Sequence, residues 1–498
     1  MSNFIVPGVY VQEQKYNLNP LSMDSRCLAG FAGICERGPI NKLTEIKSFD
    51  EYLKIFGGFE TAGVLPLSIY NYFRCGGKEC VVVRVANEED ASCASFGFGE
   101  KDNGFEIKAK SKGHWGNEII ASLWKESEEY FSITLNLRGK TESHIHLSCN
   151  KENERYFEKY VNERSKICEI KNKKLSKTPD TILNQVLQGG LDGIANMSAK
   201  DFVGKYNGLE DFSGIGSFES RDDISLVAVP DICWLKNPKE IEIVQRKLLE
   251  QAERMSGRFA ILDVPENLSP IEAISWADKY RSQFTASYYP FIDVTDPLDS
   301  TGTKTIRVPP SGAICGCIAV VDCEYGIHTS PANRILDGAV GVSYKATQGE
   351  LEMLVESGIN PLRYFPGNGV KIWGARTMSF DKEWKFINVR RTFSKVCEVL
   401  RKGTRWAVFE QNDKNLRKRL TRQVSGFLLN LWREGYFAGG TAEQGFYVRC
   451  DEELNPPESV DAGRLVCEVG LAIVRPVEFF VIKLAAEKDG ASVYIEEK

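Results

Sequence analysis

The chain has 498 residues, of which 42% are hydrophobic and 26% are charged, and its formal net charge is −5. This composition is typical of a globular protein in water, and the length predicts about three domains. No stretch approaches the ~18–20 uninterrupted apolar residues of a membrane helix, and the first residues lack a basic segment followed by an apolar core. We therefore expect neither membrane insertion nor a secretory signal.

The first 22 residues contain one β-prone run at 9–11 (Val-Tyr-Val), flanked by Pro-Gly and Asn-Pro. A strand this short has no local partner, so it must pair with the body of the protein or with another subunit. Regular structure begins where Ser48 and Glu51 form a capping box, which predicts a helix that ends at Gly-Gly. A second helix from Pro66 and a buried strand over 81–85 follow.

The character of the sequence changes between residues 91 and 186. Residues 151–177 are rich in Lys and Glu, and the strand-like runs around Ile119 and Ile133 are short. We interpret this stretch as an inserted, solvent-facing domain, with a low-complexity linker as the alternative. Four aromatic residues supply apolar mass for folding: Trp115, Trp124, Tyr130 and Phe131.

Residues 224–294 alternate between strand and helix periodicity. The predicted order is a strand at 226–229, a helix from Pro238, a strand at 259–264, a helix from Pro270 and a strand at 288–292. This β-α-β-α-β order predicts a parallel sheet that is covered by helices. Thr347 and Glu350 form a further capping box and predict another helix.

An amphipathic helix is predicted over residues 413–435, followed by β-prone pieces. Its apolar stripe consists of Leu416, Leu420, Val424, Phe427, Leu428 and Leu431. Residues 390–433 hold twelve Lys/Arg and three Asp/Glu, a net +9, so the rest of the −5 chain carries −14. Such asymmetry indicates a surface that meets an acidic partner, and a solvated helix face is the alternative.

No set of residues predicts catalysis. The chain has neither a G-x-S-x-G elbow nor a phosphate-binding G-x-x-x-x-G-K-[ST] loop. His328 with Asp322 or Asp337 could in principle form a triad, but no oxyanion loop accompanies them, so we expect a histidine packed in a loop. The 14 cysteines lack CxxC spacing, and we expect reduced thiols that pack as small hydrophobic groups, as in 311–319.

No metal or nucleic-acid site is predicted either. His144 and His146 would point two imidazoles to one strand face, but they have no third ligand at a suitable spacing. Asp293, Asp296 and Asp299 resemble a loose calcium loop, yet the glycine and glutamate of an EF-hand are missing, so we expect them to cap turns. The basic segment 414–422 lacks exposed aromatic residues for base stacking and the whole chain is acidic, and we therefore expect no nucleic-acid binding and no cofactor.

Several motifs resemble one protein family in their order and spacing. They lie at residues 7–13, 37–39, 72–77, 81–85, 309–313, 330–333, 358–363 (Gly-Ile-Asn-Pro-Leu-Arg), 370–377 (Val-Lys-Ile-Trp-Gly-Ala-Arg-Thr), 388–391 and 437–455. With these motifs the chain resembles the tail sheath proteins of contractile phages and related injection systems. The resemblance covers most of the chain but not the stretch at 91–186.

The resemblance implies an α/β fold. A central subtilisin-like α/β sheath domain would carry an inserted β-rich outer domain, an α+β C-terminal domain and extended terminal arms. The expected boundaries are 1–22 for the N-terminal linking arm, 23–90 and 187–377 for the central domain, 91–186 for the outer-surface insert, 378–484 for the tube-facing domain and 485–498 for the C-terminal linking arm.

The resemblance also implies a function, which is structural rather than enzymatic. Such a subunit polymerises as stacked hexameric rings around an inner tube in an extended, metastable state, and contracts to drive the tube through a target envelope. The implied partners are copies of itself, an inner tube protein with an acidic exterior, the baseplate, and tail terminator or cap proteins. The implied location is a virion tail or phage-tail-like particle, assembled in the cytoplasm of the producing cell.

In this family a helix of the C-terminal domain attaches to the tube, and the arms add strands to neighbouring subunits. We assign tube contact to Lys414, Arg417, Lys418 and Arg422, with the basic pair at 390–391 as the alternative. The arm strands are assigned to Val9, Tyr10, Val11, Val493, Tyr494 and Ile495. Two other classes remain as alternatives: a static tail or baseplate protein, and a subtilisin-like hydrolase that would depend on His328.

Overall fold

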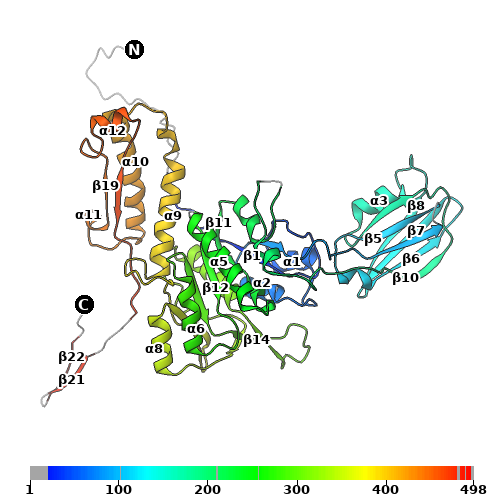
Figure 1. Cartoon of the computed structure of the whole chain (residues 1–498), viewed down its shortest axis with the longest axis horizontal. Helices are drawn as coiled ribbons and strands as arrows, with labels where there is room; N and C mark the ends of the chain where they lie inside the picture. Colours follow the sequence, from blue (N-terminus) through cyan, green and yellow to red (C-terminus); the bar gives the residue numbers. More distant parts are fainter. Residues whose placement is uncertain are drawn as a thin grey trace, which may run out of the picture. The chain divides into compact units, whose positions relative to one another are not determined.

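The computed structural model describes residues 21–100, 103–208, 211–255, 257–478, 483–487 and 490–494. The chain divides into two compact units, whose elements are labelled in Figure 1. The larger unit comprises Ser25–Ser394 and Arg475–Lys498, and the smaller unit comprises Met1–Asp24 and Lys395–Val474. The predicted N-terminal strand at 9–11 lies outside the described residues.

The larger unit is built on an eight-stranded sheet with the order β18-β17-β13-β12-β11-β1-β3-β2. Its strands are β1 (Leu28–Gly33), β2 (Thr44–Ile46), β3 (Cys80–Arg84), β11 (Ile224–Ala228), β12 (Phe259–Asp263), β13 (Thr285–Tyr289), β17 (Ile359–Phe365) and β18 (Gly369–Ile372). The six inner strands pair in parallel, and the edge strands β2 and β18 pair antiparallel. The predicted parallel sheet is therefore confirmed.

Helices cover both faces of this sheet. One face packs against α1 (Phe49–Phe56), α2 (Leu65–Arg74) and α7 (Ser311–Glu324), and the other against α4 (Ala199–Val203), α5 (Pro238–Arg254), α6 (Pro270–Ala277) and α8 (Gln348–Glu356). Side chains alternate along a strand, so Leu226 and Ala228 enter one hydrophobic cluster and Val227 enters the other. A parallel sheet buried on both faces in this way needs the near-continuous apolar runs that the sequence contains.

Local capping fixes where several of these helices begin. The Ser48 side chain accepts a hydrogen bond from the Glu51 backbone N–H, and Thr347 and Glu350 form a reciprocal capping box. Each cap satisfies backbone donors that have no partner within the first turn. The helices predicted from these two signals are confirmed, and α1 ends at Gly57, whose φ of 87° suits glycine.

A separate three-stranded antiparallel sheet has the strand order β15-β14-β16. It consists of β14 (Ile292–Thr295), β15 (Thr305–Val308) and β16 (Ala339–Val342). Asp296 and Asp299 cap turns in the β14–β15 connection, as predicted, whereas Asp293 lies within β14 and pairs with Arg307 at 3.4 Å. Asp296 accepts from the Leu298 N–H, and Asp299 accepts from the N–H groups of Thr301, Thr303 and Lys304.

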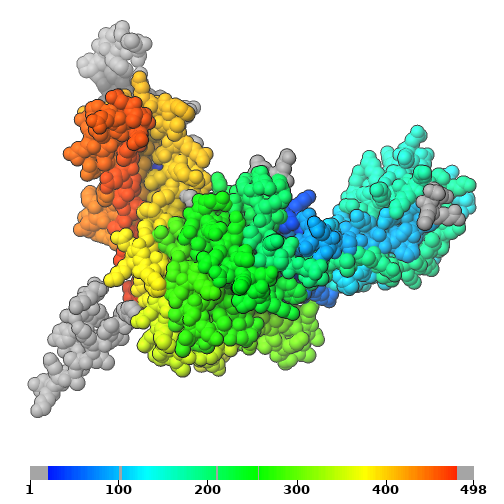
Figure 2. Space-filling view, viewed as in Figure 1, coloured from blue at the N-terminus to red at the C-terminus, as the bar shows by residue number. Residues whose placement is uncertain are grey.

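The stretch between β3 and β11 forms two further antiparallel sheets. The atoms of this stretch are mostly light blue to cyan in Figure 2. The four-stranded sheet β10-β6-β7-β8 contains β6 (Ile119–Lys125), β7 (Tyr130–Leu137), β8 (Lys140–Ser148) and β10 (Ile182–Val186). The three-stranded sheet contains β4 (Ser95–Glu100), β5 (Asn103–Ala109) and β9 (Cys168–Lys173), and helix α3 spans Phe157–Arg164. Residues between 94 and 187 form a hydrophobic cluster of their own, which excludes the linker alternative.

The smaller unit is mostly helical and contains one two-stranded antiparallel sheet. Its elements are the later part of α9 (Ile387–Gly403), then α10 (Lys414–Arg433), α11 (Ala442–Gly445), β19 (Phe446–Arg449), α12 (Pro457–Asp461) and β20 (Glu468–Leu471). All six residues of the predicted apolar stripe of α10 are buried. The chain is thus a mixed α/β protein with several sheets. No helix among the described residues is both long and apolar enough to cross a membrane.

Candidate functional site

Helix α10 turns most of its positive charge toward solvent. The helix begins after Asp413, whose carboxylate accepts a hydrogen bond from the Leu416 N–H at 2.7 Å. Because its apolar stripe is buried, the other faces must be exposed, and Lys414, Lys418 and Arg422 are exposed. Arg417 is half-buried, and its Nε donates to Asn412 Oδ1 at 2.9 Å.

These cations line one wall of a groove with a volume of about 720 Å³. The remaining lining includes an acidic wall, which no local sequence pattern predicted and which is formed by Asp451, Glu452 and Glu453. Arg449 pairs with Asp451 at 3.0 Å and with Glu453 at 3.2 Å, so part of this negative charge is already neutralised. Within the part of the chain that the structure describes, Lys414, Lys418 and Arg422 form no ion pair. They remain available to an external acidic group.

The alternative tube contact at 390–391 is wrong, because both arginines are buried. Nη1 and Nη2 of Arg391 donate to the two carboxylate oxygens of Asp322 at 2.9 and 2.6 Å. Burial lowers the pKa of Arg391, but the charge of Asp322, the neighbouring Cys27 and the hydrogen bonds to both together raise it by more, so the guanidinium stays charged. Arg390 donates to Ser394, and its guanidinium lies 4.3 Å from the Trp384 ring centroid. The net charge of +9 over residues 390–433 includes these two arginines, although both are buried.

The C-terminal arm residues fall partly within the described chain. Val493 and Tyr494 lie in β22 (Gly490–Tyr494), opposite Leu484 and Lys483 of β21 (Lys483–Glu487). This hairpin is a two-stranded sheet among the described residues, so each strand has an edge at which a further strand can add. Ile495, like Val9, Tyr10 and Val11, lies outside the described residues.

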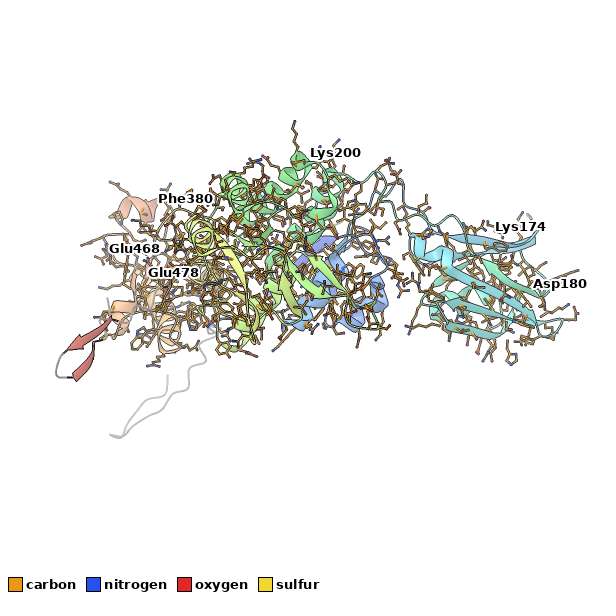
Figure 3. All side chains as sticks on the ribbon, turned by 90° about the horizontal axis from the view of Figure 1, so that it is seen from below. Lys174, Asp180, Lys200, Phe380, Glu468 and Glu478 are labelled. Carbon is orange, nitrogen blue, oxygen red and sulfur yellow. The ribbon has the colours of Figure 1, made fainter. Side chains whose placement is uncertain are left out.

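Glu478, labelled in Figure 3, fixes the chain before this hairpin to the larger unit. One carboxylate oxygen accepts from Arg376 Nε at 2.6 Å, and the other accepts from Arg376 Nη2 at 2.7 Å and from Lys385 Nζ at 2.8 Å. A bidentate arginine contact is among the stronger ion pairs in proteins. No local pattern in the sequence predicts this anchor, because about a hundred residues separate its partners.

Of the residues weighed as a hydrolase triad, Asp322 has its side chain engaged elsewhere. Both carboxylate oxygens of Asp322 bind Arg391, as described above, and Asn388 Nδ2 donates to the backbone oxygen of His328 at 2.7 Å. The Asp337 carbonyl accepts from the Cys75 thiol. Because both of its oxygens bind Arg391, Asp322 is not free to orient His328 for catalysis.

The two histidines of β8 do not share an environment either. A bulge between His144 and Leu147 breaks the alternation of the strand, so His144 is buried and His146 is exposed. His146 Nδ1 lies 2.5 Å from a carboxylate oxygen of Glu126. No group of three or more His, Cys, Asp or Glu suited to a metal ion occurs within the described ranges.

Comparison with known proteins gives matches in both units. The family described as phage tail sheath protein central domain matches residues 223–378, and the phage tail sheath C-terminal domain matches 379–487. The tail sheath protein of Burkholderia phage BcepMu is 30% identical over 321 residues, which cover 60% of this chain and 63% of that protein. A putative prophage major tail sheath protein of Pseudomonas aeruginosa (strain UCBPP-PA14) is 27% identical over 231 residues, covering 46% and 57%. The chain thus spans less than two thirds of the length of these relatives.

Solved structures show the same fold over nearly the whole chain. The sheath complex of an extracellular contractile injection system in its contracted state matches with a TM-score of 0.60, 20% identity and coverage of 98% of this chain and 99% of that one. A crystal structure of a sheath tail protein from Desulfitobacterium hafniense has a TM-score of 0.62 at 13% identity, covering 89% and 94%. The two adjacent family matches together cover more than half of the chain. The chain therefore belongs to the phage tail sheath protein family.

Proposed function

We propose that this chain is the structural subunit of a contractile sheath. It polymerises around an inner tube in an extended, metastable state and contracts to drive that tube through a target envelope. The observation that carries the proposal is the adjacent pair of family matches at 223–378 and 379–487. The fold match to sheath complexes in the contracted state supports it. As a member of a family of structural proteins, it acts without catalysis and without a cofactor.

In this proposal each segment has its own role. The central domain, at 23–90 and 187–377, is the subtilisin-like body, and the insert at 91–186 forms the outer surface of the sheath. The domain at 378–484 faces the tube, and the arms at 1–22 and 485–498 link subunits. The open edges of the β21–β22 hairpin support strand addition, in which backbone hydrogen bonds join subunits whatever their side chains.

The partners follow from the same assignment. Copies of the chain stack as hexameric rings, and the sheath ends on a baseplate and on terminator or cap proteins. Assembly takes place in the cytoplasm of the producing cell. The tube presents an acidic exterior to Lys414, Arg417, Lys418 and Arg422, and the exposure of three of these side chains supports this contact. An exposed ion pair contributes on the order of 0.2–1 kcal/mol, so the contact is weak in one subunit and strong only when repeated.

Electron microscopy of particles that contain this chain tests the function directly. The particles are imaged before and after a contraction trigger such as mild denaturant. A contractile sheath shortens and widens while the inner tube keeps its length. A static tail or baseplate protein assembles without shortening, and a hydrolase gives no filament; either result contradicts the proposal.

The tube contact is tested by replacing Arg417, Lys418 and Arg422 with glutamine. Glutamine is preferred to glutamate here because new carboxylates would face the acidic wall at 451–453 and destabilise the fold itself. We expect the variant to fold normally but to give empty or already contracted sheaths in electron micrographs.

The matched control replaces Arg401, Arg405 and Arg433 with glutamine. These three exposed cations belong to the same unit but do not line the groove. The control removes the same charge and should form extended sheaths around the tube. Extended sheaths from both variants would mean that the tube attaches elsewhere.

A further inference from the structure

Two half-buried cysteines face each other at the end of the β19–β20 ladder. In this antiparallel pair Arg449 lies opposite Glu468, so the next position in register places Cys450 opposite Cys467. The two thiols are close enough for each to shift the pKa of the other. Sequence spacing gave no sign of this, because sixteen other residues separate the two cysteines.

The register suits a disulfide bond. The Ala472 N–H donates to the Gly445 carbonyl at 2.9 Å, so this pair of the ladder is hydrogen-bonded. Because hydrogen-bonded and non-hydrogen-bonded pairs alternate, the pair of Cys450 and Cys467 falls at a non-hydrogen-bonded position. Opposite Cα atoms at such positions lie roughly 4.5 Å apart, and disulfides span Cα separations of about 4.4–6.8 Å.

A buried asparagine holds the two chain segments at this register. Asn455 is 3% exposed. Its Nδ2 donates to the Asp451 carbonyl at 3.0 Å and to the Val466 carbonyl at 2.9 Å, and its Oδ1 accepts from the Val466 N–H at 2.8 Å. The residue after Cys450 and the residue before Cys467 are therefore fastened to one side chain, which limits how far the two thiols can separate.

The two thiols differ in access and in charge environment. Cys450 lines the groove beside α10, so a dissolved reagent can reach it. Burial raises the pKa of Cys450, and the nearby Arg417 guanidinium partly opposes this. Burial raises the pKa of Cys467 to about 12. Because the thiolate is the nucleophile, Cys450 is the sulfur that reacts first.

We propose that Cys450 and Cys467 form a reversible redox site, which low-molecular-weight disulfides convert into a cross-strand disulfide bond. The Cys450 thiolate attacks one sulfur of the small disulfide, forming a mixed disulfide and releasing one small thiolate. The Cys467 thiolate then attacks Sγ of Cys450 and displaces the second small thiolate. The protons of the two cysteines pass to the two released thiolates, so two protein thiols are oxidised and one small disulfide is reduced to two thiols.

The disulfide bond would limit the movement of the acidic wall of the groove. It closes the loop of residues 451–466, which begins with the acidic wall that faces the cations of α10. In a reducing cytoplasm the thiols stay free, and in oxidising surroundings the wall becomes fixed. This inference concerns the chemistry of the chain itself and stands whether or not the groove contacts a tube.

The test uses the full, reduced chain incubated with oxidised glutathione at pH 8, followed by acid quenching, alkylation and peptide mapping without reduction. We expect a peptide pair joined through Cys450 and Cys467, about 2 Da lighter than the two reduced peptides. The bond should also raise the midpoint of thermal unfolding of the smaller unit. The variant Cys467→Ser should trap the mixed disulfide at Cys450. The variant Cys450→Ser should leave Cys467 at least about tenfold less modified than Cys450 is in the first variant.

Two internal controls come from the same digest. Cys323 is exposed and should form a mixed disulfide, which shows that the reagent is active. Cys75 and Cys317 are also neighbours, but they are 6% and 2% exposed, so they should stay unlinked while the protein is folded. The proposal fails if Cys450 stays reduced while Cys323 reacts. It also fails if glutathione accumulates on Cys450 of the folded wild-type chain without a link to Cys467.

Discussion

At the scale of single residues, the main sheet holds two buried carboxylates at the ends of adjacent parallel strands. Asp231 follows β11 and is fully buried, and Asp263 ends β12 with 2% of its surface exposed. Asp231 accepts from the backbone N–H groups of Ile34 and Val64, and Asp263 accepts from the Ser311 N–H at the first turn of α7. Burial raises the pKa of each to about 7. Their hydrogen bonds attach the backbone at Ile34, Val64 and Ser311 to the ends of these strands. Below about pH 7 the protonated form of each carboxyl group predominates in the folded state.

Asp263 gives a prediction on the pH dependence of stability. In the unfolded chain an aspartate titrates near about 3.9, so between pH 4 and 7 the folded protein holds a proton that the unfolded chain has released. This contribution to the free energy of unfolding is therefore present at low pH and is lost as the pH rises through the folded pKa of about 7. Asp263→Asn cannot ionise, so from pH 5 to pH 8 it should gain about 2–3 kcal/mol relative to wild type in urea unfolding.

Asp299 provides a control because its pKa is shifted in the opposite direction to that of Asp263. Asp299 is half-buried, and hydrogen bonds from the Lys304 and Thr301 N–H groups and from the Thr301 hydroxyl lower its pKa. Its contribution is present above the unfolded pKa and is lost only as the pH falls. The variant Asp299→Asn should therefore change little relative to wild type between pH 5 and pH 8. Equal profiles for both variants would show that Asp263 is ionised in the folded protein.

At the scale of elements, helices α2 and α7 pack with their backbones in close approach. A Cβ atom on Gly312 would lie 2.2 Å from the Ser68 carbonyl oxygen, and one on Gly316 would lie 2.3 Å from the Tyr72 carbonyl oxygen. The two glycines are one helical turn apart on α7, so they form a flat strip against α2. The close approach of α2 and α7 requires small residues on α7, which explains the run of small side chains at residues 311–319.

Gly316→Ala should therefore destabilise the larger unit. The added methyl group meets backbone atoms that cannot rotate away, and overpacking of this kind costs about 1–3 kcal/mol or more. Gly426→Ala in α10 is the matched control, because nothing lies within 4 Å of its Cβ position. That change should stabilise the smaller unit by about 0.5–1 kcal/mol through helix propensity alone. Urea unfolding of both variants measures the difference, and an unchanged Gly316→Ala protein would contradict the close packing.

At the scale of the whole molecule, the inserted stretch leaves and rejoins the main sheet at one place. Ser92 and Leu191 exchange backbone hydrogen bonds, each at 3.1 Å. The insert also contacts the body through Arg138, which pairs with the buried Glu36, and through the Lys112 carbonyl, which accepts from the buried Arg84. It has its own hydrophobic cluster, so most of its packing is internal.

Deleting residues 94–189 and joining the ends with a short Gly/Ser bridge should leave a folded chain that still forms sheaths. Loop-closure cost rises only slowly with length, and the two ends already lie side by side. The deletion leaves Glu36 without Arg138, so adding Glu36→Gln should recover part of the lost thermal stability. Circular dichroism and electron microscopy measure folding and assembly. A folded variant that does not polymerise would place the insert at a contact between subunits.

Much of the local structure follows from short-range patterns in the sequence. The caps at Ser48 and Thr347, the alternation of strand and helix over 224–294 and the apolar stripe of α10 all appear in the structure as predicted. These signals succeed because capping and amphipathicity act within one or two helical turns. The family resemblance likewise rests on motifs that can be identified along the chain.

Contacts between distant residues appear only once the chain has folded. The burial of Arg391 against Asp322, the acidic wall facing α10, the anchor between Arg376 and Glu478 and the register of Cys450 with Cys467 leave no local pattern. Charge counts along the sequence treat a buried and an exposed arginine alike, although burial removes one of them from any external contact. Strand register and burial are set by packing across the whole unit, so tertiary structure decides which cations, carboxylates and thiols can act.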